Sequence, residues 1–326
     1  MIDILKRKSD HIDLAIEQRI NAAVDNNPWD DVHLVHNALP EKDLLNFNLS
    51  TEFLGKKLNL PFLISSMTGG PFKAEQINAN LAEAAQELGI AMGVGSQRID
   101  LLHAGNGGLT NTLRKFAPTI PLYANLGAAQ LRDNISYKQI RQVIDTISAD
   151  ALIIHLNSLQ EFLQDGGDTD WRGLLLSIEG TCNFLDIPVI VKEVGMGISA
   201  SVAIRLVNAG VQAIDVAGKG GTNFIDIEAR RATNPMLKAV GEIYKNWGIT
   251  TPEAVRDIRA ELSKIPLIAS GGIRHGLDAA KAIKLGANIV AQAGPVLKSA
   301  MESTQAVIDH FRIMEAALRI GIACSE

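Results

Sequence analysis

Eight short apolar runs, rich in Val, Ile and Leu, recur along the chain and constrain its fold more than any other feature. Stretches with helical periodicity lie between them, such as Glu75–Leu88 and Leu277–Leu285, and Gly89, Gly210 and Gly286 follow helical stretches as C-terminal caps often do. Continuous apolar runs suit strands buried on both faces of a parallel sheet. The runs are Leu60–Ser66, Ala91–Ser96, Pro121–Gly127, Asp150–Asn157, Pro188–Gly195, Ala213–Gly218, Pro266–Gly272 and Asn288–Gly294.

This strand-then-helix rhythm predicts a (β/α)8 TIM barrel. One unit takes about 33 residues, near the usual spacing for that fold. Eight regular units without a small second domain favour the barrel over the alternative, an open doubly wound sheet. We therefore expect an N-terminal extension at 1–59 and the barrel itself at 60–326. Within the extension, Phe47–Leu58 has two short runs around Gly55 and predicts a hairpin that caps the bottom of the barrel.

A long interval separates the sixth and seventh runs, at residues 219–265. It contains a Gly-rich loop, a charged stretch and then ordinary helix. Active sites of barrels lie at the C-terminal ends of the strands, so this interval is a candidate lid.

Composition excludes several classes of protein. The 326 residues are 47% hydrophobic and 21% charged, unlike disordered, collagen-like or disulfide-rich chains. A net charge of -5 gives no basic footprint for nucleic acid or a membrane surface. Cys182 and Cys324 form no metal motif and fit a reducing compartment. We find no transmembrane run or signal peptide, and we expect a cytoplasmic protein whose apolar helices form a homo-oligomer.

Polar residues cluster just after the apolar runs, at the expected mouth of the barrel. His155 and Lys192 would be costly to bury inside strands without partners, whereas both are usable at the mouth. Any one of these residues alone could be a satisfied core group. Their recurrence at equivalent positions of several units predicts a functional site.

Three glycine-containing loops follow the last three runs: GKGGT at 218–222, SGGIR at 270–274 and the Ala293–Gly294 pair. Glycines let backbone N–H groups approach a phosphate, although each loop alone could be a simple turn. A phosphorylated cofactor is the natural ligand, and FMN suits the mouth. Thr68, Ser96 and Asn125 are placed to bind the edge of its ring, and Lys192 is placed near N1 and the C2 carbonyl. The alternative for Lys192 is an ion pair with a carboxylate such as Glu193.

A second anion site is suggested near the N-terminus. Arg7 and Lys8 are adjacent, and His11 lies one helical turn away. Together with Arg98 they could clamp a diphosphate, because Arg offers paired hydrogen bonds and Lys a point charge. The alternative is a solvated basic N-terminus.

Seven motifs occur in one order and resemble a known family. They are RKSDH (7–11), MTGG (67–70), GVGSQR (93–98), HLNSLQE (155–161), VKEVGMG (191–197), AGKGGTNF (217–224) and SGGIRHG (270–276). The chain resembles the type 2 isopentenyl-diphosphate isomerases from about Arg7 to Lys298. Ser158, Lys219 and Phe224 differ from residues found in many members of that family, and none of these differences removes an expected catalytic group.

The resemblance implies an FMN-dependent barrel that interconverts isopentenyl and dimethylallyl diphosphate by an allylic proton shift in isoprenoid biosynthesis. It implies reduced FMN as acid and base, NADPH as reductant, Mg²⁺, and a homo-oligomer such as a tetramer or octamer. It places Gln160 next to the reacting carbons, gives His155 and Asn157 a catalytic role in holding the substrate and its diphosphate, and makes Glu161 the Mg²⁺ ligand. The implied substrate-binding residues are Arg7, Lys8, His11, Ser96, Arg98 and Gln160. The implied FMN-binding residues are Met67, Thr68, Gly69, Ser96, Asn125, Lys192, Thr222, Gly271, Gly272, Ile273, Ala293 and Gly294.

Two other functions remain open at this point. An FMN-dependent dehydrogenase or oxidase on the same barrel would need a positioned proton acceptor and net turnover of nicotinamide. A non-catalytic flavin- or phosphate-binding scaffold would bind flavin without turnover, and it leaves the RKSDH and HLNSLQE motifs unexplained.

Overall fold

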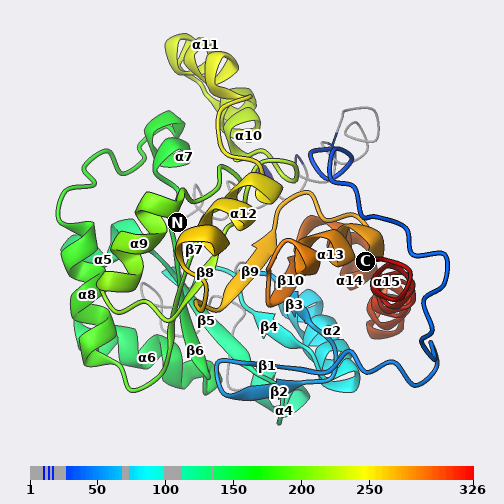
Figure 1. Ribbon diagram of the computed structural model, residues 1–326. Helices are drawn as coiled ribbons and strands as arrows, with labels where there is room; N and C mark the ends of the chain where they lie inside the picture. Colours follow the sequence, from blue (N-terminus) through cyan, green and yellow to red (C-terminus); the bar gives the residue numbers. More distant parts are fainter. Residues whose placement is uncertain are drawn as a thin grey trace.

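Eight parallel strands close into a barrel at the centre of the molecule (Figure 1). The structure, a computed structural model, describes residues 10, 11, 14, 17, 27–67, 73–98, 112–133 and 135–326. The strand order around the barrel is β10-β3-β4-β5-β6-β7-β8-β9, which confirms the predicted TIM barrel. The strands are β3 (Phe62–Ile64), β4 (Ala91–Gly93), β5 (Leu122–Gly127), β6 (Ala151–His155), β7 (Val189–Lys192), β8 (Ala213–Asp215), β9 (Leu267–Ser270) and β10 (Ile289–Gln292).

Helices surround the barrel and bury its outer face (Figure 1). Gly89, Gly210 and Gly286 all have positive φ, at 64°, 91° and 110°, as expected of residues that end helices. The helices are α2 (Lys73–Leu88), α4 (Thr112–Phe116), α5 (Ala128–Asp133), α6 (Tyr137–Ile147), α7 (Ser158–Leu163), α8 (Leu174–Phe184), α9 (Ala200–Asn208), α10 (Phe224–Arg231), α11 (Pro235–Tyr244), α12 (Thr251–Glu261), α13 (Gly276–Lys284), α14 (Gly294–Glu302) and α15 (Thr304–Ala323). No helix among these described residues is both long and apolar enough to span a bilayer.

The interior of the barrel has an apolar layer beneath a polar layer. Ile153, Ile190 and Ile268 belong to one interior apolar cluster. Side chains alternate between the two faces of a strand, so the residues two positions later also point inward. These residues are His155, Lys192 and Ser270, and by the same rule Asn125 and Asp215 join them from β5 and β8. Alternation therefore places the polar layer at the C-terminal ends of the strands.

A two-stranded hairpin closes the other end of the barrel. Strands β1 (Thr51–Phe53) and β2 (Lys56–Leu58) pair antiparallel below the barrel strands (Figure 1). Phe53 and Leu58 are almost wholly buried and belong to the interior apolar cluster. The hairpin thus seals the interior at the end where the strands begin, opposite to the polar layer.

The interval after β8 contains three helices. Helices α10 and α11 project beyond the barrel, and α12 returns to pack beside it (Figure 1). Asn223, Asn234 and Thr250 cap the three helices by accepting hydrogen bonds from first-turn backbone N–H groups. The interval therefore places ordered helices beside the mouth of the barrel.

Candidate functional site

A chain of hydrogen bonds crosses the mouth from β3 to β6. Asn125 Nδ2 donates to Ser66 Oγ at 2.7 Å, and Asn125 Oδ1 lies 2.7 Å from Nδ1 of His155. Asn125 is buried while His155 is partly accessible. These contacts leave Nε2 of His155 as the ring atom directed away from Asn125.

Helix α7 and its N-cap residue, Asn157, present buried polar side chains just after β6. Asn157 Nδ2 donates to Glu161 Oε1 at 2.9 Å, and Glu161 Oε2 accepts from the backbone N–H of Asp168 at 3.0 Å. Gln160, one residue earlier, is also buried. Arg98 lies 3.9 Å from Asp168, so the GSQR loop approaches the segment that holds Glu161. The structure thus brings the HLNSLQE and GSQR motifs together.

Glu228, on α10, links Gln160 to the N-terminal motif. Its Oε1 accepts a hydrogen bond from Gln160 Nε2 at 2.9 Å and lies 2.9 Å from His11 Nε2. Its Oε2 accepts from Arg231 Nη1 at 2.8 Å. Burial raises the pKa of Glu228, but the bonds from His11 and Gln160 and the Arg231 charge outweigh it and lower the pKa. A buried, ionised carboxylate therefore lies directly behind Gln160.

Sequence reasoning missed Glu228. Its segment, FIDIEARR, contains two acids and two arginines and reads as an ordinary charged helix. The only feature of the sequence that could have pointed to Glu228 is its position in the helical segment that follows the glycine loop after β8. Only the fold shows that this residue meets Gln160 and His11.

Lys192 lies at the end of β7 and is buried, with 7% of its surface exposed. Its Nζ donates to the backbone carbonyl of Glu193 at 2.6 Å, so the alternative ion pair with the Glu193 carboxylate is not the contact seen. The Glu193 carboxylate instead accepts from the backbone N–H groups of Val194, Gly195 and Met196. Burial outweighs these bonds and raises the pKa of Glu193 to about 7.

The glycine loops pack backbone against backbone at one side of the mouth. Gly271 has φ +100°, and a Cβ there would lie 2.1 Å from the carbonyl oxygen of Gly218. No side chain fits at this position without moving the backbone. Helix α14 begins nearby with Ala293 as its N-cap, which provides no side-chain hydrogen bond to the first turn. Pro295 has no N–H and the N–H of Val296 donates to the carbonyl of Ala293 at 3.0 Å, so this turn offers a phosphate the N–H of Gly294 and the positive end of the helix dipole.

A turn from the N-terminal extension supports the Gly271–Gly272 loop from outside. Trp29 Nε1 donates to the carbonyl of Gly271 at 3.1 Å, and Asn27 Nδ2 donates to that of Gly272 at 2.8 Å. Trp29 is fully buried, and Lys281 Nζ donates to its carbonyl at 2.5 Å. Both loop carbonyls are therefore held toward the turn.

The other predicted residues divide into two groups. The first group lies at the mouth, at the ends of strands or in the segments that follow them, and consists of Met67, Ser96, Arg98, Thr222, Gly272, Ile273, Ala293 and Gly294. All of these are partly buried except Ile273, which is buried. Arg7, Lys8, Thr68 and Gly69 lie outside the described residues.

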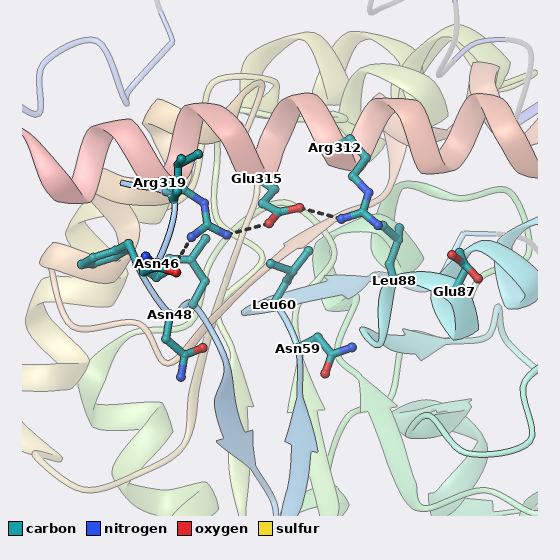
Figure 2. A pocket seen from close by; sticks show the side chains of 12 residues that line it. Asn46, Asn48, Asn59, Leu60, Glu87, Leu88, Arg312, Glu315 and Arg319 are labelled. Atoms are coloured by element: carbon teal, nitrogen blue, oxygen red, sulfur yellow. Dashed lines mark hydrogen bonds and ion pairs between the residues drawn. The ribbon is translucent and has the colours of Figure 1, made fainter. Parts of the chain in front are cut away.

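A separate cavity of about 420 Å³ lies between α15 and the segment before β1 (Figure 2). Glu315 bridges Arg312 and Arg319 across its wall, with contacts of 3.0 and 2.7 Å, and Arg319 also donates to the carbonyl of Phe47. Its charged groups therefore largely satisfy one another. None of the predicted site residues lines it, so we place the functional site at the barrel mouth.

Comparison with known proteins decides the family. The model of the FMN-dependent dehydrogenase family matches residues 3–104 and 157–324. Isopentenyl-diphosphate delta-isomerase of Xanthobacter autotrophicus is 54% identical, over 97% of this chain and 92% of its own length. The enzyme of that name from Vibrio parahaemolyticus is 52% identical over 98% and 93%, and the one from Rickettsia rickettsii is 44% identical over 98% and 93%.

The chain belongs to the isopentenyl-diphosphate delta-isomerase family, within the FMN-dependent dehydrogenases. This membership confirms the resemblance predicted from the seven motifs. A solved structure of mandelate oxidase carrying an FMN adduct has a TM-score of 0.64 and 18% identity, over 91% of this chain and 85% of that one. At that identity it shows the shared barrel fold.

Proposed function

We propose that this chain interconverts isopentenyl and dimethylallyl diphosphate by an allylic 1,3-proton shift, using reduced FMN, as a step of isoprenoid biosynthesis. The observation that carries the proposal is the meeting of Gln160, Glu228 and His11 beside the polar layer of a barrel from this isomerase family. These three residues come from α7, α10 and the RKSDH motif.

The chemistry of the substrate explains this arrangement. Protonation of an unactivated alkene produces positive charge at a tertiary carbon. The buried carboxylate of Glu228 has its charge offset by Arg231 at 2.8 Å and lies behind Gln160, so it acts on the reacting carbons through the Gln160 amide. Gln160 is neutral and a poor base, so we assign it orientation of the reacting carbons, with Glu228 fixing its amide. His155 and Asn157 complete the wall on which the hydrocarbon lies.

FMN fits the residues of the mouth. Reduced FMN supplies an electron-rich ring that gives and takes the proton. The uncapped start of α14 and the Gly271–Gly272 loop suit its phosphate, and Lys192 suits the N1 edge of its ring. The full set that we propose for FMN is Met67, Thr68, Gly69, Ser96, Asn125, Lys192, Thr222, Gly271, Gly272, Ile273, Ala293 and Gly294.

The diphosphate is assigned to the side of the mouth near Arg98. Arg7, Lys8, His11, Ser96 and Arg98 would bind its oxygens, in keeping with their cationic or hydroxyl groups. Mg²⁺ commonly binds one carboxylate together with substrate phosphates, so Glu161 alone can serve as its ligand from the protein. No cluster of three metal-binding side chains occurs among the described residues, which fits a metal held largely by the substrate.

NADPH is proposed as the reductant that prepares the flavin, and the protein is proposed to act as a cytoplasmic tetramer or octamer. Exposed apolar residues on α15, including Ile313 and Ile320, support self-association. Light scattering on the purified protein tests the oligomer, since a monomer would refute it.

Turnover with defined reductant separates the isomerase from the two other functions. Purified protein receives FMN, Mg²⁺, isopentenyl diphosphate and a limiting amount of NADPH without oxygen. The isomerase makes many molecules of dimethylallyl diphosphate per NADPH consumed. A dehydrogenase would consume NADPH in proportion to product, and a scaffold would bind FMN and make none; either result overturns the proposal.

A further inference from the structure

One buried carboxylate at the mouth is only half satisfied. Asp215, at the end of β8, is 1% exposed. Its Oδ1 accepts a hydrogen bond from Ser270 Oγ at 2.6 Å, and the backbone N–H of Ala217 also faces the carboxylate, whereas no hydrogen bond of ordinary geometry reaches Oδ2 from the described residues. A buried carboxylate of this kind is unfavourable unless a nearby positive charge compensates it. Asp215 belongs neither to the FMN set nor to the substrate set.

The register of the barrel places Lys192 beside it. Lys192 and Asp215 are direct partners across β7 and β8. Both side chains point inward, because Ile190 and Ala213, two residues earlier, belong to the interior apolar cluster. Neighbouring strands lie about 4.8 Å apart, so the two opposite charges share one small region of the polar layer.

Lys192 and Asp215 each favour the charged form of the other. Burial lowers the pKa of Lys192, and the Asp215 charge opposes this more strongly than that of Glu193 does. Burial raises the pKa of Asp215, and Lys192 is the first influence that opposes it. Loss of either charge would therefore favour the neutral form of its partner.

The other titratable groups around Lys192 are engaged elsewhere. His155, its register partner on β6, contacts Asn125. The carboxylate of Glu193 is held by the backbone N–H groups of the turn that follows it. Tyr123 lies in the apolar layer below. Asp215 is therefore the carboxylate that shares the polar layer with Lys192.

We propose that Asp215 is a positioning residue: its carboxylate, held by Ser270, keeps Lys192 protonated at the edge of the flavin. The inference rests on the proposed function, which places the N1 edge of FMN against Lys192. Ser270 fixes one carboxylate oxygen, and the other remains directed into the layer that Lys192 occupies.

The direction in which the pKa of flavin N1 shifts when Asp215 is removed distinguishes a role through Lys192 from a direct effect of the carboxylate on the flavin. An isolated negative charge beneath the flavin would oppose the anionic form of reduced FMN, so removing it would lower the pKa of flavin N1. If Asp215 acts through Lys192, removing it neutralises the ammonium, and the N1 pKa rises. The two roles predict shifts in opposite directions.

The test uses the FMN-loaded protein, reduced with dithionite without oxygen and titrated by flavin absorbance against pH. Asp215→Asn should raise the N1 pKa by about one pH unit, the effect of losing a neighbouring charge, and Lys192→Met should raise it at least as much. Ser270→Ala keeps the carboxylate and should give a smaller upward shift, which preserves the test if Asp215→Asn folds poorly. Asp257→Asn, an exposed acid on α12, is the control and should give no shift.

Three outcomes overturn the inference. An unchanged or lowered N1 pKa in Asp215→Asn, with Lys192→Met raising it, refutes the role of Asp215 and leaves the proposed function intact. An unchanged pKa in Lys192→Met shows that the flavin does not lie against this lysine and refutes the FMN placement as well. A downward shift in Ser270→Ala contradicts the link through Asp215.

Discussion

Glu228→Gln is the substitution that most sharply tests the role of the buried carboxylate behind Gln160. The carboxylate accepts from Gln160 and Arg231 and contacts His11, with all three distances between 2.8 and 2.9 Å. An amide of nearly the same shape carries no charge, and its NH₂ group faces at least one of these donors. The substitution therefore removes the charge and leaves the packing largely unchanged.

The size of the effect follows from the Gln160 contact. A buried hydrogen bond to a charged group contributes about 1.5–3 kcal/mol. If this orientation is needed in the transition state, kcat/KM should fall about 10- to 150-fold, since about 1.4 kcal/mol corresponds to a factor of ten. The change should appear mainly in kcat, because Gln160 is assigned to the reacting carbons rather than to the diphosphate.

The assay is the initial rate of dimethylallyl diphosphate formation by the reduced, FMN-loaded enzyme. Glu242→Gln is the matched control, because Glu242 is an exposed acid on α11 whose partner, Lys245, lies outside the site. The control should retain wild-type kcat/KM. A folded, FMN-saturated Glu228→Gln protein with wild-type kcat/KM would refute the reasoning.

Three further predictions concern the β1–β2 hairpin, the buried Glu193 and the turn that supports the Gly271–Gly272 loop. Phe53→Ala should lower the free energy of unfolding in urea by about 3–5 kcal/mol and leave kcat unchanged. A loss under about 1 kcal/mol would contradict the role of the hairpin in sealing the barrel interior. Burial raises the pKa of native Glu193 to about 7, so between pH 4.5 and 7 the native state retains a proton that the unfolded state releases. The free energy of unfolding should therefore fall by at most about 3.4 kcal/mol as pH rises through this range. Glu193→Gln should make the free energy of unfolding less dependent on pH in this range. The same dependence in the variant and the wild type would refute the prediction. Trp29→Phe removes the hydrogen bond to the Gly271 carbonyl and should weaken FMN binding about tenfold, as measured by fluorescence titration. Trp247→Phe, at an exposed position, is the control and should leave the affinity unchanged. Equal FMN affinities of Trp29→Phe and the wild type would refute the role of Trp29 in supporting the loop.

The barrel was predictable because its signal is local. Each buried strand appears as a continuous apolar run, and the helix ends at Gly89, Gly210 and Gly286 are encoded by single residues whose φ is positive. The inward positions of His155 and Lys192 follow from alternation once the strands are known. Much of the polar layer could thus be placed from sequence.

The contacts between distant segments could not be placed in this way. Glu228 acquires its role by meeting Gln160 and His11, which lie 68 and 217 residues away in sequence. Trp29 likewise reaches the carbonyl of Gly271 across 242 residues. Neither residue has a local pattern that separates it from an ordinary helix acid or a core aromatic. Their roles depend on tertiary packing rather than on periodicity.

Proton exchange with solvent tests the central claim most directly. Isopentenyl diphosphate is supplied in deuterated water, without oxygen, to the wild-type enzyme with reduced FMN and Mg²⁺, and the product is followed by NMR. The account predicts catalytic formation of dimethylallyl diphosphate carrying deuterium, with no reductant consumed in proportion to product. An FMN-loaded, reduced protein that leaves the substrate unchanged would contradict it.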